Sequence, residues 1–314
     1  MSSSTGEPNA GGGLIAVTGA TGFIGSHLLQ RLDECGTRNR ALIREKPGRE
    51  TVAPKSTEIV SGSLSDPQAL EVLLSEAKTC IHLAGATKSV NASGFHSANV
   101  IGTYNLAAIA AKAGIEHFIC VSSQAARAPH ISDYAASKAA SEATLKALNA
   151  QMKVTIIRPP AVIGPGDPML PPMFDLIRMG WLPAPSEPRD GPRSFAVISV
   201  EDLVAQIIAS AENKGAGTSP IEPCSVSATN WQRVGDAAGA ALGRKVRVLK
   251  IWAGILQAAG LIADGLATLV RRPMPISHGK VRELLAADWT YDEPVRDAMK
   301  LEAILRACFL DQNS

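Results

Sequence analysis

The chain has 314 residues, of which 46% are hydrophobic and 19% charged, and its formal net charge is +2 at neutral pH. This composition is typical of a globular enzyme and excludes a disordered or fibrous chain. The charge is too small to favour nucleic acid or an anionic membrane, so a small molecule is the expected partner. The five cysteines are widely spaced, which indicates neither a zinc site nor a disulfide framework and fits a reducing cytoplasm.

Residues 1–13 are rich in serine and glycine and contain neither a basic residue nor an apolar stretch. Such a segment is not a signal or transit peptide, and we expect a disordered tail. The chain after it alternates short apolar runs with amphipathic segments. This alternation predicts an α/β fold with a doubly wound parallel sheet.

Residues 14–17 form a short apolar run, and glycines at positions 19, 22 and 25 follow it at the start of an amphipathic segment. This order of strand, turn and helix start predicts a phosphate-binding turn. Gly19 permits a tight exit from the strand, Gly22 lets the backbone approach a pyrophosphate, and Gly25 lets the helix pack closely on the sheet. The unpaired amides that would face the anion are those of Gly22, Phe23 and Ile24.

The second predicted strand, residues 40–44, ends in Arg44, with Lys46 and Arg49 close behind it. NAD-binding units place an acidic residue near this strand end to bind the adenosine ribose, and that residue would repel a 2′-phosphate. A guanidinium instead binds phosphate through two hydrogen bonds, so Arg44 favours NADP over NAD. The alternative is that Arg44 is a solvated loop charge.

Two further strand-to-helix units follow. A strand near residues 58–60 leads to Asp66 and Pro67, which predict a helix cap followed by proline in the first helical position. His82 lies in the strand expected within residues 78–85. We interpret it as a packed residue, because no second titratable group stands beside it at metal-ligand spacing. Asn99 lies in a helix predicted over residues 95–113.

Residues 117–121 form a predicted strand that ends in Ser122 and Ser123, and residues 133–149 form an alanine-rich helix with Tyr134 and Lys138 in its first turns. A spacing of four places Tyr134 and Lys138 on one helix face. Hydride transfer at a carbinol carbon needs a group that moves the proton of its oxygen, and a nearby ammonium favours the phenolate form of a tyrosine. A hydroxyl of Ser123 or Ser122 could hold the substrate oxygen against Tyr134.

Proline and glycine become dense after the strand predicted at residues 153–157. We therefore assign residues 14–165 to a dinucleotide-binding domain, with residues 195–213 returning to it as a strand and a helix. Residues 166–194 and 214–314 form a smaller substrate-binding lobe. The bulky, proline-rich segment 168–192 is expected to be either a pocket wall or a plain linker.

Residues 251–270 form the most apolar run of the chain. On a helical wheel Gln257, Asp264 and Thr268 lie on one side, and the isoleucines and leucines lie opposite, which predicts an amphipathic helix. Asp264 and three glycines make it a poor membrane span, and the absence of a basic rim disfavours a helix lying on a membrane. We expect it to pack against the core or to line an apolar pocket.

A series of motifs occurs between residues 14 and 203: Thr18-Gly-Ala-Thr-Gly-Phe-Ile-Gly25, His82-Leu-Ala-Gly85, Asn99-Val-Ile-Gly-Thr-Tyr-Asn-Leu106, Val121-Ser-Ser123, Tyr134-Ala-Ala-Ser-Lys138, Arg158-Pro-Pro-Ala-Val-Ile-Gly-Pro-Gly-Asp167 and Ile198-Ser-Val-Glu-Asp-Leu203. Together they resemble the extended short-chain dehydrogenase/reductase family, in the epimerase/dehydratase-like branch that includes 3β-hydroxysteroid dehydrogenases. The resemblance implies a Rossmann fold and an NAD(P)-dependent enzyme.

By this resemblance Ser123, Tyr134 and Lys138 are catalytic, Asn99 belongs to a proton relay, and Lys138 also binds the nicotinamide ribose. The cofactor is further expected to contact Gly19, Thr21, Gly22, Phe23, Ile24, Gly25, Arg44, Ser63, Leu64, Leu83, Ala84, Gly85, Pro159 and Val162. Substrate contacts are expected from Thr87, Gln124 and Arg193. The resemblance also implies a homodimer through the helices that carry Asn99 and Tyr134, and no metal is expected.

The chain departs from the family pattern at Ser63, where the family has aspartate, and at Gln124, where dehydratases have an acidic residue. The second departure and the short spacing between Ser123 and Tyr134 favour an NADP-dependent dehydrogenase or reductase that acts on a hydroxyl or ketone of a small, fairly apolar molecule. Arg193 stands where nucleotide-sugar enzymes bind the substrate diphosphate, so a nucleotide-sugar epimerase is one alternative. A dinucleotide-binding protein without turnover is another.

Overall fold

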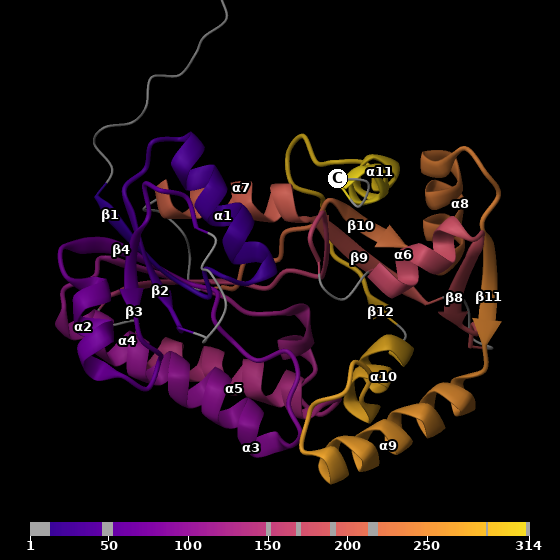
Figure 1. The fold of residues 1–314 in the computed structure, drawn as a ribbon, viewed down its shortest axis with the longest axis horizontal. Coiled ribbons are helices and arrows are strands. Elements are labelled where there is room, and N and C mark those ends of the chain that lie inside the picture. Colours follow the sequence, from indigo (N-terminus) through magenta and orange to yellow (C-terminus); the bar gives the residue numbers. More distant parts are fainter. Residues whose placement is uncertain are drawn as a thin grey trace, which may run out of the picture.

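The computed structural model describes residues 13–45, 53–148, 152–167, 171–188, 193–212, 219–286 and 288–311. Its centre is a six-stranded parallel sheet in the order β3-β2-β1-β4-β5-β6 (Figure 1). The strands are β1 (Leu14–Thr18), β2 (Asn39–Ile43), β3 (Glu58–Ser61), β4 (Ala77–His82), β5 (His117–Val121) and β6 (Lys153–Ile157). This order reverses between β1 and β4, and a doubly wound sheet binds its ligand at that switch point. The expected Rossmann fold is confirmed.

Helices cover both faces of this sheet, because its strands are apolar on both sides. One core cluster joins the sheet to α2 (Pro67–Leu74), α4 (Gly102–Lys112) and α5 (Asp133–Leu148). The other joins it to α1 (Phe23–Glu34) and α7 (Val200–Glu212). Residues 200–212 therefore pack in the same core as the first helix, although almost 170 residues separate them.

Two local predictions have a clear outcome. Asp66 does cap α2, since its side chain accepts a hydrogen bond from the amide of Ala69 at 3.2 Å, and Pro67 takes the first helical position. The helix predicted over residues 95–113 is interrupted. It consists of α3 (Ala92–Phe95), a π-helical segment η1 (His96–Ile101) and α4, and a π-turn of this kind often marks a functional site.

The remaining elements form the part of the molecule to the right in Figure 1. They are β7 (Ala161–Ile163), α6 (Pro171–Arg178), β8 (Trp181–Pro185), β9 (Ser194–Ser199), β10 (Val226–Thr229), α8 (Trp231–Leu242), β11 (Arg247–Ile251), α9 (Ala253–Val270), α10 (His278–Leu285), β12 (Asp288–Trp289) and α11 (Leu301–Asp311). Strand β9 pairs with β7, β10 and β12, and β8 pairs with β11. The proline-rich segment thus contains a helix and a strand, which β11 stabilises through pairing that local sequence does not reveal.

Helix α9 is turned the opposite way from the expectation. Its buried residues are Gly260 and Ala267, and Asp264 faces inward, where its carboxylate accepts a hydrogen bond from the amide of His278 at 3.1 Å. The apolar stripe, which was expected to pack against the core, faces outward, with Ile262 at 64% and Leu269 at 79% exposed. Among the described helices, α9 is long and apolar enough to cross a membrane. Only 11% of it is buried inside the protein, so it is not a core helix.

Candidate functional site

The glycine turn connects β1 to α1 directly beside the end of β4. Gly19 has φ +74°, and a Cβ on it would lie 2.5 Å from the amide nitrogen of Ala84. A Cβ on Gly25 would overlap the carbonyl of Gly19, so the start of the helix lies against the turn. Only glycine fits these two positions. Three predicted cofactor residues, Leu83, Ala84 and Gly85, are thereby brought against the turn.

The first amides of α1 are suited to an anion. The N-cap of α1 is Gly22, and no side chain caps the helix start. The amide of Gly22, which was expected to be unpaired, instead donates to the carbonyl of Gly19 at 3.0 Å, because the turn closes there. The N–H groups of Phe23, Ile24 and Gly25 have no partner within the helix, and the helix dipole favours negative charge there. These residues fit the pyrophosphate of a dinucleotide. Thr21, also predicted to contact the cofactor, lies in the turn and is exposed.

Arg44 is exposed directly after β2, and its side chain makes no hydrogen bond or ion pair with another described residue. Its neighbour Glu45 is held away, because its carboxylate accepts a hydrogen bond from the hydroxyl of Ser61 in β3 at 2.6 Å. Lys46 and Arg49 lie outside the described residues. The cation available at this strand end among the described side chains is therefore Arg44.

The segment after β3 also lies at this edge of the sheet. The hydroxyl of Ser63 is 2.9 Å from that of Ser65, and the carbonyl of Leu64 accepts a hydrogen bond from Asn105 at 3.1 Å. A Cβ on Gly102 would lie 2.8 Å from the side chain of Leu64. Ser63 and Leu64 are thus fixed to α4.

Lys138 lies in the first turns of α5, and its ammonium reaches the sheet. The side chain is 8% exposed, and Nζ donates a hydrogen bond to the carbonyl of Val121 at 3.1 Å, at the end of β5. Gly85 separates it from Asn99, because a Cβ on Gly85 would lie 3.6 Å from Nζ and 3.0 Å from the Asn99 side-chain oxygen. The structure therefore brings Gly85, Asn99 and Lys138 together.

Asn99 lies within the π-helical segment and is 2% exposed. Its side-chain oxygen accepts from the amide of Ala86 at 2.7 Å, and its Nδ2 donates to the carbonyl of Ala86 and to the Ser137 hydroxyl. These bonds use the side chain to fix the loop after β4. The π-turn shifts the register of the helix so that this side chain reaches the loop.

Tyr134 is half-buried, and its ring lies 5.9 Å from that of Phe95, centroid to centroid. Ser132 precedes it and caps α5, since its hydroxyl accepts from the amide of Ala135 at 3.0 Å. The same hydroxyl donates to Glu283 in α10 at 2.5 Å. The first turn of α5, which carries Tyr134, is thereby connected to the C-terminal part of the chain.

The two serines after β5 point to different surroundings. Ser122 is buried, and its hydroxyl donates to Glu142 of α5 at 2.6 Å, so its proton is not available to a substrate. Ser123 is half-buried, and its hydroxyl accepts from the amide of Ala125 at 3.2 Å, which leaves its proton available to a substrate oxygen. This difference supports Ser123 over Ser122 as the substrate-facing serine.

Gln124 begins the short 3₁₀ turn η2 (Gln124–Arg127), and its amide donates to the carbonyl of Pro159 at 3.0 Å. Its side-chain oxygen is buried and has no donor among the described residues. A buried acceptor without a donor is uncommon and calls for a partner. Gln124 is therefore suited to accept a hydrogen bond from a bound substrate.

A buried ionic network behind the site was not predicted from the sequence. Glu142, 2% exposed, forms an ion pair with Arg158 at 2.6 Å, and Arg158 also pairs with Glu222 at 3.3 Å. The hydrogen bonds that Arg158 donates to Glu142 and Glu222 raise the pKa of Arg158, against the opposing effect of burial. Glu142 is four residues after Lys138, so helical spacing alone places it on the inner face of α5.

His82 is a packed residue, as expected. Its two ring nitrogens lie 2.7 Å from the Thr18 hydroxyl and 2.9 Å from the Thr103 hydroxyl. Burial, and secondarily the charge of Lys138, lowers the pKa of His82 to about 3. The imidazole is therefore neutral at physiological pH and links β1, β4 and α4. Among the described residues no group of three or more His, Cys, Asp or Glu side chains could hold a metal ion.

Arg193 is 8% exposed, and its guanidinium is engaged by backbone. It donates to the carbonyl of Leu285 at 2.9 Å and to that of Ser186, while its own amide donates to Glu187.

Three further predicted contact residues lie elsewhere around the sheet. Thr87 is exposed in the loop after β4. Val162 pairs in register with Ile198 of β9 and packs against the core of the parallel sheet. Pro159 is buried beside Gln124.

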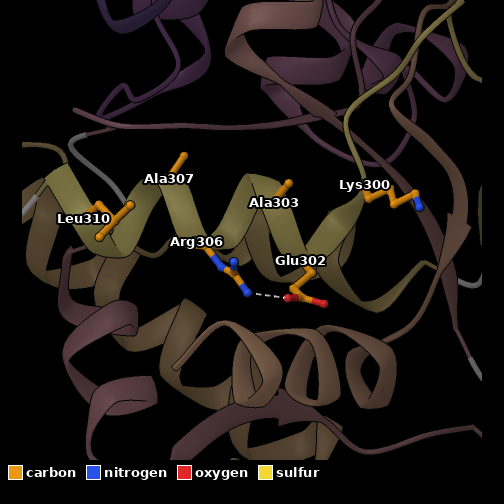
Figure 2. A pocket seen from close by; sticks show the side chains of 6 residues that line it. All are labelled: Lys300, Glu302, Ala303, Arg306, Ala307 and Leu310. Carbon is orange, nitrogen blue, oxygen red and sulfur yellow. Dashed lines mark hydrogen bonds and ion pairs between the residues drawn. The ribbon is translucent and has the colours of Figure 1, made fainter. Parts of the chain in front are cut away.

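A hollow of about 400 Å³ lies along α11 (Figure 2). Figure 2 shows Ala303 and Ala307 pointing to one side of the helix, while Arg306 pairs with Glu302 at 2.6 Å. Its border is completed by Lys300 and Leu310. No predicted site residue borders it, so we assign it no role in the chemistry.

Comparison with known proteins agrees with this geometry. The pattern of the NAD dependent epimerase/dehydratase family matches residues 15–221. A ceramide reductase from Caulobacter vibrioides is 37% identical over 279 residues, covering 88% of this chain and 86% of that protein. A 2-alkyl-3-oxoalkanoate reductase from Stenotrophomonas maltophilia is 31% identical, covering 54% of this chain and 57% of that one. The crystal structure of UDP-glucose 4-epimerase from Thermotoga maritima has a TM-score of 0.71 at 18% identity, covering 96% and 98% of the two chains.

Proposed function

The chain belongs to the NAD dependent epimerase/dehydratase family of extended short-chain dehydrogenases/reductases, and on this premise we propose that it is an NADPH-dependent reductase of a ketone in a lipid-like molecule. The observation that carries the proposal is the assembly of Gly85, Asn99 and Lys138 at the end of the parallel sheet. Ser123 follows β5, the strand whose end accepts the Lys138 hydrogen bond, and Tyr134 lies one helical turn before Lys138. The bound nicotinamide supplies the hydride in this reaction.

The protein's own residues handle the oxygen of the substrate. The Ser123 hydroxyl donates a hydrogen bond to the ketone oxygen and orients it, and the Tyr134 phenol gives its proton to that oxygen as the alcohol forms. The Lys138 ammonium favours the phenolate that remains, and Asn99 fixes the loop that carries Gly85. In the opposite direction the same groups remove the alcohol proton.

The class of substrate follows from three observations. The Caulobacter vibrioides relative is named a ceramide reductase and matches along most of both chains. The unsatisfied Gln124 oxygen suits a substrate that carries an N–H or O–H donor close to its ketone. The Stenotrophomonas maltophilia relative is named a 2-alkyl-3-oxoalkanoate reductase. We also propose that residues 166–194 and 214–314 bind this substrate.

A nucleotide-sugar epimerase is the weaker candidate. Its supporting residue is Arg193, but the guanidinium donates to the carbonyls of Ser186 and Leu285 and is buried. An arginine used in this way fastens β8 and α10 to β9, and at 8% exposure its remaining N–H donors are largely inaccessible to a diphosphate. The likeness to sugar-nucleotide enzymes at 18% identity extends to the fold alone.

The decisive experiment measures oxidation of NADPH with a panel of ketones of increasing acyl length. Tyr134→Phe removes the proton donor, so we expect kcat to fall by about 10² to 10⁴ while NADPH binding is unchanged. Val72→Ala is the control, because Val72 is 56% exposed on α2, outside the proposed site and the proposed dimer face. Retention of activity in Tyr134→Phe, or conversion of UDP-sugars without net use of cofactor, would overturn the proposal.

Cofactor choice has its own test. Arg44→Ala removes the exposed guanidinium at the end of β2, so we expect the KM for NADPH to rise about tenfold with little change for NADH. The control is Arg38→Ala, since Arg38 is another exposed arginine beside β2 that pairs with Glu58 at 3.8 Å. Equal effects of Arg44→Ala on both cofactors would contradict a role in 2′-phosphate binding.

We further propose that the enzyme is a cytoplasmic homodimer formed through α4 and α5. The support is the family resemblance together with two apolar side chains exposed on this face, Ile101 at 45% and Tyr104 at 52%. The molar mass in solution tests the dimer.

A further inference from the structure

The geometry points to a second surface, separate from the site: α9 lies along an anionic lipid bilayer with its apolar stripe inserted among the lipids. The stripe consists of Ile255, Ile262, Leu266 and Leu269, which are between 46% and 79% exposed. These positions recur at spacings of seven, four and three, so they project from one side of the helix. The inward residues Gly260, Asp264 and Ala267 occupy the opposite side.

The stripe is unusual for a surface that faces water. No charged residue lies on it, because Asp264, the one charged residue within α9, faces α10. A contiguous apolar patch of this kind marks an interaction surface. Figure 1 shows α9 at the periphery of the molecule, with α10 between it and β12. The outward face is therefore open to a large, flat partner.

The ends of the helix favour lipid as that partner. Trp252, 70% exposed, stands at the start, and aromatic side chains of this type prefer the level of the lipid headgroups. Arg271 and Arg272 follow the last turn and are exposed, and Lys250 precedes Trp252. The absence of a basic rim within residues 251–270 disfavoured a helix lying on a membrane, but these cations lie just beyond the two ends of that segment. Cations at both ends of an uncharged apolar stripe complement an anionic headgroup layer. Most of the binding energy comes from the apolar side chains, since the cations are few.

A helix that crosses the bilayer would not preserve the observed contacts. Asp264 accepts the amide hydrogen bond of His278, and a Cβ on Gly260 would lie 2.9 Å from the Cα of His278. Crossing would remove both contacts and bring a carboxylate into the hydrocarbon. The helix therefore lies flat, with α10 behind it.

This docking would bring the catalytic centre to the membrane. Helix α10 contacts α9 through His278 and also contacts the start of α5, where Glu283 accepts from Ser132 and a Cβ on Gly279 would lie 3.0 Å from the Ser132 side chain. Ser132 caps the turn that carries Tyr134. The consequence for turnover of a lipid rests on the proposed function, whereas binding to the membrane does not.

The test is cosedimentation of the full chain with vesicles of phosphatidylcholine, with and without phosphatidylglycerol. We expect Ile262→Glu and Leu269→Glu each to weaken binding about tenfold or more, because each places a carboxylate in the headgroup and acyl boundary. Val72→Glu is the matched control, since Val72 is 56% exposed on α2. Urea unfolding of each variant confirms that the fold is kept. Equal binding by all four proteins, or binding by none, would overturn the proposal.

Two further readouts identify the face and its partner. Brominated phospholipid should quench Trp252 emission in the wild type and lose this effect in Trp252→Phe.

Arg271→Gln combined with Arg272→Gln should remove the gain in binding that phosphatidylglycerol provides, and no gain in the wild type would overturn the anionic preference. A dimer that forms without lipid and dissociates in Ile262→Glu would show instead that two copies cover this face. These measurements need no turnover, so they stand even if the proposed reaction fails.

Discussion

Helices α5 and α9 are both long and rich in alanine, yet they face the protein in opposite ways. Helix α5 buries Lys138 and Glu142 against the sheet, whereas α9 exposes isoleucines and leucines and turns Asp264 inward. Hydrophobic patterning alone assigns charged residues to the outside and apolar residues to the inside. The buried charged residues of α5 lie at the predicted catalytic centre, and the exposed apolar residues of α9 form the proposed lipid surface. Exceptions to hydrophobic patterning are expected at functional sites of this kind.

The comparison predicts that the polar residues of α5 contribute strongly to stability. Glu142→Gln removes the carboxylate that pairs with Arg158 in a buried setting, so we expect the free energy of unfolding to fall by about 3 kcal/mol. Urea unfolding measures the change. The control is Glu302→Gln, which removes the exposed partner of Arg306 and is expected to cost less than about 1 kcal/mol. A loss of the same small size in both variants would contradict a stabilising network behind the site.

An effect that grows as the pH falls is expected from His82, the neutral histidine that links β1, β4 and α4. The pKa of His82 is about 3 in the fold, where burial lowers it from 6.5. Between these values the unfolded chain binds one more proton than the folded chain, so the free energy of unfolding falls as the pH is lowered from 6.5 towards 3, by about 1.4 kcal/mol per pH unit. His82→Gln should remove this part of the pH dependence. Unfolding measured at several pH values tests it, and an unchanged slope in His82→Gln would contradict it.

The smallest effect is expected on the outer face of α9. Ile262→Ser replaces a side chain that is 64% exposed, so the free energy of unfolding should change by no more than about 0.5 kcal/mol. Ala267→Ser on the inner face, where the residue is 4% exposed, should cost more, because it buries a hydroxyl against α10. Urea unfolding of both variants decides the point. A large loss in Ile262→Ser would mean that the stripe is packed in solution.

The sequence by itself determined the dinucleotide-binding half. The hydrogen bond that closes the turn from Gly19 to Gly22 and the cap at Asp66 lie within a few residues, so local pattern was sufficient to predict them. Helical spacing alone likewise predicts that Tyr134 and Lys138 share one face of α5. The family resemblance already implied Ser123 rather than Ser122, and the different hydrogen bonds of the two hydroxyls support that choice. The roles assigned to these residues remain predictions until the variants are measured.

Only the tertiary structure decided the rest. The strand β8 exists through its pairing with β11, about 65 residues away, and the orientation of α9 depends on its contact with α10. The Glu142, Arg158 and Glu222 network joins three segments that are far apart along the chain. Propensity and periodicity describe neighbours in sequence, whereas these features come from contacts between distant segments. For α9, the helical wheel shows that the helix has two different faces but not which of the two faces the protein. Which face is inside is settled by what the fold packs against it.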